Sequence, residues 1–175
     1  MKYQIRKYIF LILALTSFFY IDCPGQEAKK KSNDSVEIWI NEIKKEYANI
    51  NNDTAKLRIV QEDIFSQTTE GGFSRKFYDG TTLRKAIFTF FGETGQSTDE
   101  CYLLNGEIIF VYQRLVLYKS PIYMGKTEIK NREENRYYFK NQKLIQWIGP
   151  DNVIVNEGLY PEKENEILAD IKNIH

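Results

Sequence analysis

The residues that most often carry out catalysis or bind metal ions are scarce in this chain. Histidine occurs once, as His175 at the last position, and the only cysteines are Cys23 and Cys101. This composition excludes histidine-based triads, Cys–His dyads and the common zinc sites. The glycines at 71–72 and at 92 and 95 lack the following helix that a phosphate-binding loop needs. We therefore expect no catalytic residue, no cofactor and no metal site.

Carboxylates are the remaining candidates for acid–base chemistry. A glycosidase-type mechanism needs two of them about 5 Å or about 6.5–9.5 Å apart across a cleft. The adjacent acidic pairs in this chain are Glu62-Asp63, Asp99-Glu100 and Glu133-Glu134. Because neighbouring residues of a strand point to opposite faces, the members of such a pair cannot act together in a regular strand. A non-catalytic protein is therefore expected, with a carboxylate-based hydrolase as an alternative.

Aromatic residues offer a different chemistry, that of binding. The chain has 12 tyrosines and 11 phenylalanines, a richness that favours a sheet protein. Strand alternation could place four aromatic side chains in one stripe: Tyr112, Tyr118, Tyr138 and Trp147. If exposed, such a stripe could hold a sugar or an extended peptide. The alternative is that these side chains pack in the core or in cross-strand pairs.

The N-terminal segment has the features of an export signal. Basic residues within 2–7 precede an apolar run over 8–21, which is short for a bilayer span but fits the hydrophobic region of a secretory signal peptide. Cys23 and Gly25 are small residues two apart, as signal peptidase needs before its cut. This predicts cleavage after Gly25, so that residues 1–25 form the signal peptide.

Lipidation of Cys23 is the alternative, because this cysteine follows the apolar run where a lipoprotein signal would have it. Asp22 fits poorly, since the position before such a cysteine normally holds a small side chain. We therefore expect an exported protein, either periplasmic or extracellular, or one anchored to the membrane through Cys23. Membrane contact is expected only through the signal peptide or a lipid anchor.

The charge balance argues against one class of partner. The chain has 24 basic and 24 acidic residues, and removal of residues 1–25 leaves a net charge of −2. No strong field would attract nucleic acid or an anionic membrane. The expected partner is therefore an unknown protein or glycan of the cell envelope. Cys101 has no intrachain partner once Cys23 is removed or lipidated, and we expect it to be a small buried residue.

The remaining chain is expected to form a single domain over residues 34–175, after a polar, disordered linker over 26–33. A helix is expected from Asp34 to about Asp53, because apolar residues recur at helical spacing: Val36, Trp39, Ile40, Ile43, Tyr47 and Ile50. A second helix is expected near the end, with Pro161 in its first turn and an apolar face that includes Ile167 and Leu168.

Between the helices the hydrophobic pattern has a period of two, which is typical of strands. Strands are expected within 56–67, 73–80, 81–92, 99–118 and 135–148, with hairpin turns at Asp79-Gly80, Asn105-Gly106 and Asn141-Gln142. Residues 119–134 are expected to form a long irregular connection. The fold class is α+β, an antiparallel β-meander of about seven strands with an N-terminal and a C-terminal helix. Both helices are expected on one face of the sheet.

The three hairpins share the pattern aromatic–x–(Asp/Asn)–Gly–x–x–Leu. It is carried by Tyr78-Asp79-Gly80, the segment 90–95, Tyr102 with Asn105-Gly106, and Tyr137-Tyr138 with Asn141. From about Gly71 to Ile148 the chain resembles variant MORN-type hairpin repeats and a group of exported bacterial proteins with such repeats. It departs from the pattern at Gln142, where the repeats have glycine, and at Thr81-Thr82. The resemblance implies hairpins and no activity for any residue.

Two tripeptides match an acceptor pattern for O-glycosylation, Asp34-Ser35-Val36 and Asp53-Thr54-Ala55. Ser35 and Thr54 are therefore candidate sites, with a helix cap and an ordinary turn as the alternatives. Together these features predict an exported, non-catalytic binding or interaction protein of unknown partner. The alternatives are a surface-anchored lipoprotein, an immunity or inhibitor-type protein, and the carboxylate-based hydrolase in the envelope.

Overall fold

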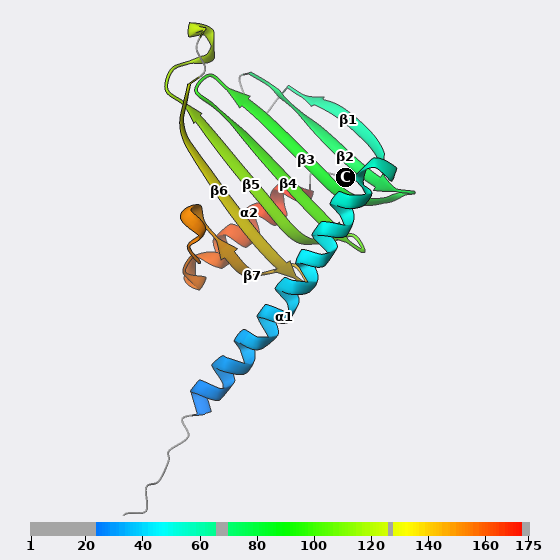
Figure 1. Cartoon of the computed structure of the whole chain (residues 1–175), viewed down its shortest axis with the longest axis vertical. Helices are drawn as coiled ribbons and strands as arrows, with labels where there is room; N and C mark the ends of the chain where they lie inside the picture. The colour runs from blue at the N-terminus through cyan, green and yellow to red at the C-terminus, as the bar shows by residue number, and fades with distance from the viewer. Residues whose placement is uncertain (1–23, 66–69, 126–127, 173–175) are drawn as a thin grey trace, which may run out of the picture.

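The computed structural model describes residues 24–65, 70–125 and 128–172. Seven antiparallel strands form one sheet, in which each strand pairs with the next along the chain (Figure 1). The strands are β1 (Arg58–Ile64), β2 (Gly72–Asp79), β3 (Thr82–Gly92), β4 (Gly95–Leu104), β5 (Glu107–Tyr118), β6 (Ile129–Lys140) and β7 (Lys143–Ile148). The expected α+β meander is confirmed.

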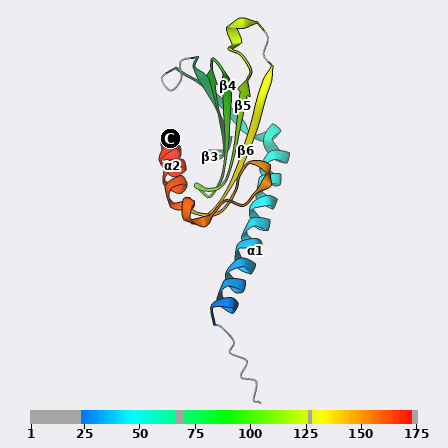
Figure 2. The ribbon, with the colours of Figure 1, turned by 90° about the vertical axis from the view of Figure 1, so that its left-hand side faces the viewer.

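The two helices lie on opposite faces of the sheet, and the prediction that they share one face is wrong (Figure 2). Helix α1 (Pro24–Asp53) packs on one face and α2 (Tyr160–Lys172) on the other. The physical reason is that the central strands are apolar on both faces. In β4, Cys101 and Leu103 belong to the apolar cluster under α2, whereas Tyr102 belongs to the cluster under α1. Figure 2 also shows that the sheet curves toward α2.

Helix α1 begins at Pro24, ten residues before its expected start at Asp34. The segment 26–33, expected to be a disordered linker, is therefore helical, and the N-terminal part of α1 projects beyond the sheet (Figure 1). Asp34 lies inside the helix and so does not cap it. The expected apolar face is confirmed in its centre, where Ile40, Ile43 and Ile50 are buried against the sheet.

The hairpin turns follow the sequence signals closely. Asn105 and Gly106 have φ of 54° and 81°, as a two-residue hairpin turn requires. Asn141 and Gln142 have φ of 49° and 61°, so the turn forms there without the glycine of the repeat pattern. The first turn lies one residue later than expected, at 80–81, because Asp79 is still paired with β3.

Two strands are longer than the hydrophobic pattern indicates. Strand β4 begins at Gly95 instead of 99, and β6 begins at Ile129, within the segment 119–134 that was expected to be irregular. Both extensions are mostly polar, yet their backbones pair with β3 and β5, with one register shift in β6 between Ile129 and Asn131. Sequence alternation is lost there because the extended ends of these strands are not buried in the two apolar clusters.

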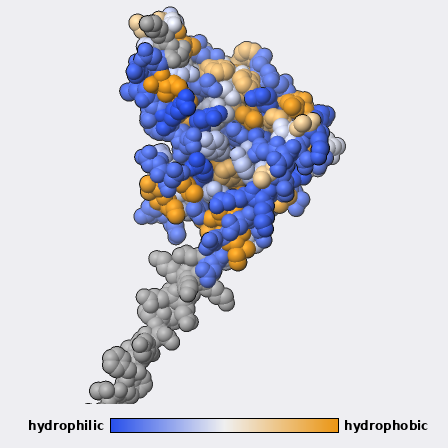
Figure 3. All heavy atoms as spheres, viewed as in Figure 1, coloured by the Kyte–Doolittle hydropathy of each residue, from blue (hydrophilic) through white to orange (hydrophobic). Residues whose placement is uncertain are grey.

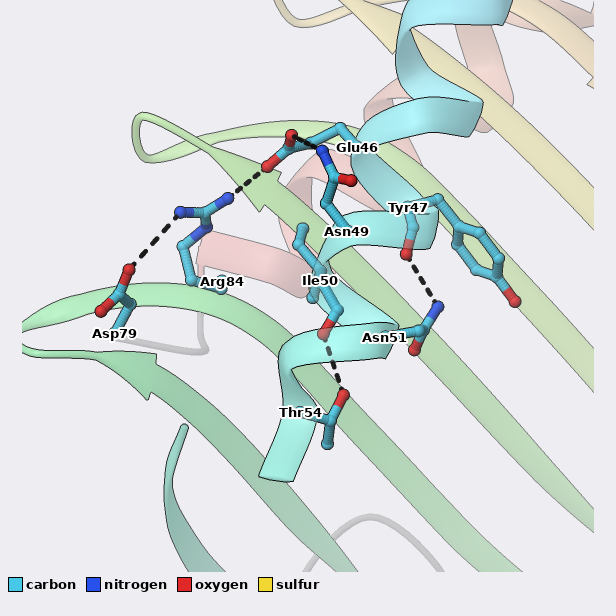
Figure 4. A network of polar contacts seen from close by, with 8 residues as sticks. All are labelled: Glu46, Tyr47, Asn49, Ile50, Asn51, Thr54, Asp79 and Arg84. Atoms are coloured by element: carbon cyan, nitrogen blue, oxygen red, sulfur yellow. Dashed lines mark hydrogen bonds and ion pairs between the residues drawn. The ribbon is translucent and has the colours of Figure 1, made fainter. Parts of the chain in front are cut away.

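Polar contacts fix the C-terminal half of α1 to the sheet (Figure 4). Arg84 of β3 forms an ion pair with Glu46 of α1 and lies 3.9 Å from Asp79 of β2. At the end of the helix, the Thr54 hydroxyl donates to the carbonyl of Ile50 at 2.9 Å. The Arg84–Glu46 ion pair joins the helix to the β2–β3 hairpin, whereas the Thr54 hydrogen bond lies within the end of the helix.

A second polar cluster lies beneath the last turn of α1. The Lys85 Nζ lies 2.8 Å from Glu100 Oε2 and 2.9 Å from Asn51 Oδ1. The Tyr102 hydroxyl donates to Glu100 Oε2 at 2.7 Å. Lys85 is buried, and its charge is therefore neutralised within the fold by Glu100.

Helix α2 is held against the edge strand β7 by one buried carboxylate. Glu164 accepts the backbone N–H of Leu144 at 2.7 Å and the ammonium group of Lys143 at 2.9 Å. Burial alone would raise the pKa of Glu164, but these two hydrogen bonds outweigh it and lower the pKa. The Tyr160 hydroxyl also accepts the N–H of Trp147 at 3.2 Å. The edge of β7 is thus covered by α2.

Candidate functional site

The four aromatic residues expected to form a stripe are divided between the two faces of the sheet. Tyr138 is 5% exposed and lies in the apolar cluster under α1, with Tyr112 packed against that cluster. Trp147 packs against the cluster under α2, and its Nε1 donates to Asn135 at 2.9 Å. Tyr118 is half-buried at the far end of β5. The structure therefore brings together two of the four and forms no single stripe.

Tyr112 and Tyr138 line a hollow beside α1, together with Tyr47 of the helix and Arg136 of β6. The hollow has a volume of about 320 Å³ and is open to solvent. The sheet face that α1 crosses is mostly hydrophilic, with separate hydrophobic patches and no continuous apolar area (Figure 3). Among the described residues, the hydrophobic patches on this face are thus separate from one another.

A more enclosed cavity lies on the opposite face, between the curved sheet and α2. Its volume is about 300 Å³. Apolar walls come from Phe88 and Phe90 of β3, Val111 of β5 and Ile167 of α2. Ligand pockets in proteins start at about this size and combine apolar walls with a few converging polar groups. This cavity is the candidate site.

A row of paired residues crosses the floor of the cavity from strand to strand. Successive cross-strand partners are Glu62, Ser74, Phe88, Asp99 and Gln113, contributed by β1 to β5 in order. Direct partners in an antiparallel sheet have side chains on the same face, about 5 Å apart. The pairing therefore assembles polar and aromatic side chains from five strands into one line under α2.

Asp99 is the most perturbed group in this row. Burial raises the pKa of its carboxyl from 3.8 to about 6, a hydrogen bond from the Gln113 side chain opposes the rise, and the nearby carboxylate of Asp170 adds to it. Its Oδ1 is buried and has no hydrogen-bond partner within the described residues. The Gln113 carbonyl oxygen in turn accepts the Tyr137 hydroxyl at 3.3 Å. Perturbed buried carboxyls of this kind are concentrated at functional sites.

The pKa of the next residue in the chain, Glu100, is shifted in the opposite direction. Glu100 points to the other face, where Lys85 and Tyr102 bind its carboxylate. Burial alone would raise the pKa of Glu100, but the hydrogen bonds from Lys85 and Tyr102 hold it below its usual value. The reasoning that adjacent carboxylates in a strand cannot act together is confirmed for this pair.

The sequence-based reasoning nevertheless missed a group of carboxylates from separate elements. Glu62, Asp99, Glu166 and Asp170 all line the cavity, and they come from β1, β4 and α2. No signal in the local sequence joins them. Their common face follows only from the strand register and from the position of α2. Among residues 24–65, 70–125 and 128–172, no group of three histidine, cysteine or carboxylate side chains could hold a metal ion.

The remaining residues that were predicted as sites do not lie together in the structure. Cys101 is 3% exposed in the wall of the cavity, and burial raises the pKa of its thiol, which confirms a small buried residue. Ser35 is exposed on α1, and Thr54 is half-buried with its hydroxyl bonded to Ile50. Both glycosylation sites stay predictions. Cys23 and His175 lie outside the described residues.

Comparisons with known proteins add no assignment. The chain matches no protein-family model, no curated protein and no solved structure. In the part of the chain that the structure describes, no helix is long and apolar enough to cross a membrane.

Proposed function

We propose that the protein is an exported, non-catalytic binding protein whose ligand occupies the cavity between α2 and the sheet. The observation that carries the proposal is the cavity itself, with a volume of about 300 Å³ and apolar walls around a line of polar groups. A ligand that fits would have a compact apolar body and one or two polar groups. A protein or glycan of the envelope would have to present a group of this size.

Export is supported by the basic, apolar and small-residue segments in residues 1–25. The intact mass of the chain from culture medium, periplasm and membrane fractions tests this step. A chain that starts at Gln26 corresponds to a soluble exported form, and a chain that starts at lipidated Cys23 corresponds to an anchored form. A full-length chain found only in the cytoplasm would contradict both.

Binding in the cavity can be tested with the neutral fluorescent probe N-phenyl-1-naphthylamine and the chain as isolated from cells. We expect saturable fluorescence enhancement, which Ser74→Leu abolishes because the larger side chain fills the cavity floor. Thr89→Leu is the matched control, since Thr89 is as buried as Ser74 but does not line the cavity. Thermal unfolding of both variants verifies that they fold.

A second readout keeps the test informative if Ser74→Leu does not fold. The side chains of Val111 and Ile167 line the cavity. A probe bound in the cavity should therefore give intermolecular NOEs to their methyl groups in the NMR spectrum of the unaltered chain. Saturable fluorescence that gives no such NOEs and survives Ser74→Leu would place the probe elsewhere and contradict the proposal.

A carboxylate-based hydrolase is the second candidate, because four carboxylates line the cavity and Asp99 has the pKa of about 6 expected of a general acid. It is less supported, since Lys76 pairs with Glu62 at 3.2 Å and Lys163 pairs with Glu166 at 2.6 Å. Hydrolysis of a panel of p-nitrophenyl glycosides that disappears in Asp99→Asn would favour this function over simple binding.

A further inference from the structure

The charged side chains that line the cavity are unbalanced. Four carboxylates face one ammonium group, that of Lys76, which is paired with Glu62. The second nearby cation, Lys163 of α2, is paired with Glu166. Asp99 lies beside Phe88, its direct cross-strand partner. Lys163 is near enough to lower the pKa of Asp99, but among the described residues no cation forms an ion pair with it.

Glu100 provides a comparison, because its carboxylate is neutralised by other side chains of the protein. Glu100 has Lys85 at 2.8 Å and the Tyr102 hydroxyl at 2.7 Å. Asp99, one residue away on the other face, has a hydrogen bond from the neutral amide of Gln113 and a buried Oδ1 without a partner among the described residues. A buried carboxylate oxygen without a partner is costly. A ligand that supplies the missing donor would remove that cost.

We infer that the cavity binds a compact ligand with a protonated amine, which contacts Asp99 while its apolar part lies against Phe88 and Phe90. The inference rests on the proposed function, because it names the chemical class of ligand for the same cavity. An ammonium group suits the site because it donates hydrogen bonds and also supplies the positive charge that the cavity lacks. The adjacent aromatic faces favour the same charge.

The inference predicts that binding depends on pH. Asp99 must be ionised to hold a cation, and burial places its pKa at about 6. The charged groups that face it are Lys163, Glu166 and Asp170 of α2, and the sheet adds the ionisable side chains of Cys101 and Tyr137. Glu62 and Lys76 line the same cavity further along β1 and β2. The change in binding is therefore expected around pH 6, where Asp99 gains or loses its proton.

Three compounds with one skeleton test the inference by isothermal titration calorimetry: 3-phenylpropylamine, 3-phenylpropan-1-ol and 3-phenylpropanoate. At pH 7.5 we expect the amine to bind at least tenfold more tightly than the alcohol and the carboxylate to bind least. Asp99→Asn should reduce the amine to the affinity of the alcohol and leave the alcohol within about twofold. Asp63→Asn, which removes an exposed carboxylate on the other face of β1, is the charge-matched control.

The pH series completes the design. Between pH 7.5 and pH 5 the advantage of the amine should disappear in the unaltered chain, whereas binding of the alcohol should change little. Equal binding of amine and alcohol, or tighter binding of the carboxylate, would overturn the inference and leave the cavity a binding site of another class. If none of the three binds, the inference also fails. The proposed function then falls with it only if N-phenyl-1-naphthylamine fails as well.

Discussion

Replacement of Asp99 by Asn should stabilise the protein at neutral pH. A carboxyl whose pKa rises from 3.8 in the unfolded chain to about 6 in the fold is destabilising when ionised. One pKa unit corresponds to about 1.36 kcal/mol, so the two-unit rise costs about 3 kcal/mol of unfolding free energy. Asn keeps the size of the side chain and removes the charge. We expect a gain of about 2–3 kcal/mol at pH 7.5.

The sign and the pH window follow from proton binding. Below pH 4 the carboxyl is protonated in both states, and the substitution should change stability little. Between pH 4 and pH 6 the folded state keeps a proton that the unfolded state loses, so the unaltered protein loses stability as the pH rises. Above about pH 6 the full cost is present. The difference between the two proteins should therefore grow across this window and then stay constant.

Urea unfolding of both proteins at half-unit steps from pH 4 to pH 8 measures this difference. Asp63→Asn is the control at an exposed position and should change the free energy of unfolding by less than about 0.5 kcal/mol. A variant Asp99→Asn that is less stable than the parent at pH 7.5, or a difference independent of pH, would refute the reasoning about burial. A site that is destabilising in the empty protein and useful for binding is a recognised compromise between stability and function.

Three further results are expected. Glu164→Ala should lower the free energy of unfolding by about 2–3 kcal/mol, because the buried backbone N–H of Leu144 loses a charged acceptor. The exposed Glu162→Ala should change it by less than about 0.5 kcal/mol. If urea unfolding shows equal losses for the two variants, Glu164 does not anchor α2 to β7. Gly72→Ala should lower the free energy of unfolding by more than about 2 kcal/mol, because the added Cβ would lie 2.2 Å from the carbonyl oxygen of Thr89. Gly92→Ala should be tolerated, since the atom nearest to its Cβ would be 3.6 Å away. Thermal unfolding of the two variants measures the difference. Cys101 should resist iodoacetamide until the protein unfolds, since burial raises the pKa of its thiol, and peptide mapping by mass spectrometry would expose any fast labelling of the native protein.

The order of elements could be predicted from the sequence because each local signal has a local cause. Asn105-Gly106 and Asn141-Gln142 adopt positive φ, and the hydrophobic period changes from helical to alternating where α1 gives way to β1. The placement of the helices could not be predicted. Tyr137 and Tyr138 are both buried on opposite faces, so the pattern of β6 does not say which face each helix covers.

The candidate site could not be predicted from the sequence for a related reason. The row of paired residues from Glu62 to Gln113 forms only when the strands pair in the observed register. That register is shifted by irregularities such as those after Phe77 and after Tyr102, which no residue type marks in the sequence. Asp99 therefore stood out only as a neighbour of Glu100, with which it shares no face.

The meander has a consequence for the order in which the chain can fold. Each strand pairs with the strand that follows it, so the sheet can grow by successive hairpins with short loops to close. Helix α1 is synthesised before all of them, but besides β3 and β4 it contacts β5 and β6, which follow it only after four other strands. Its docking therefore waits for a largely completed sheet. During the interval the apolar face of α1, which includes Ile40, Ile43 and Ile50, has no completed surface to pack on.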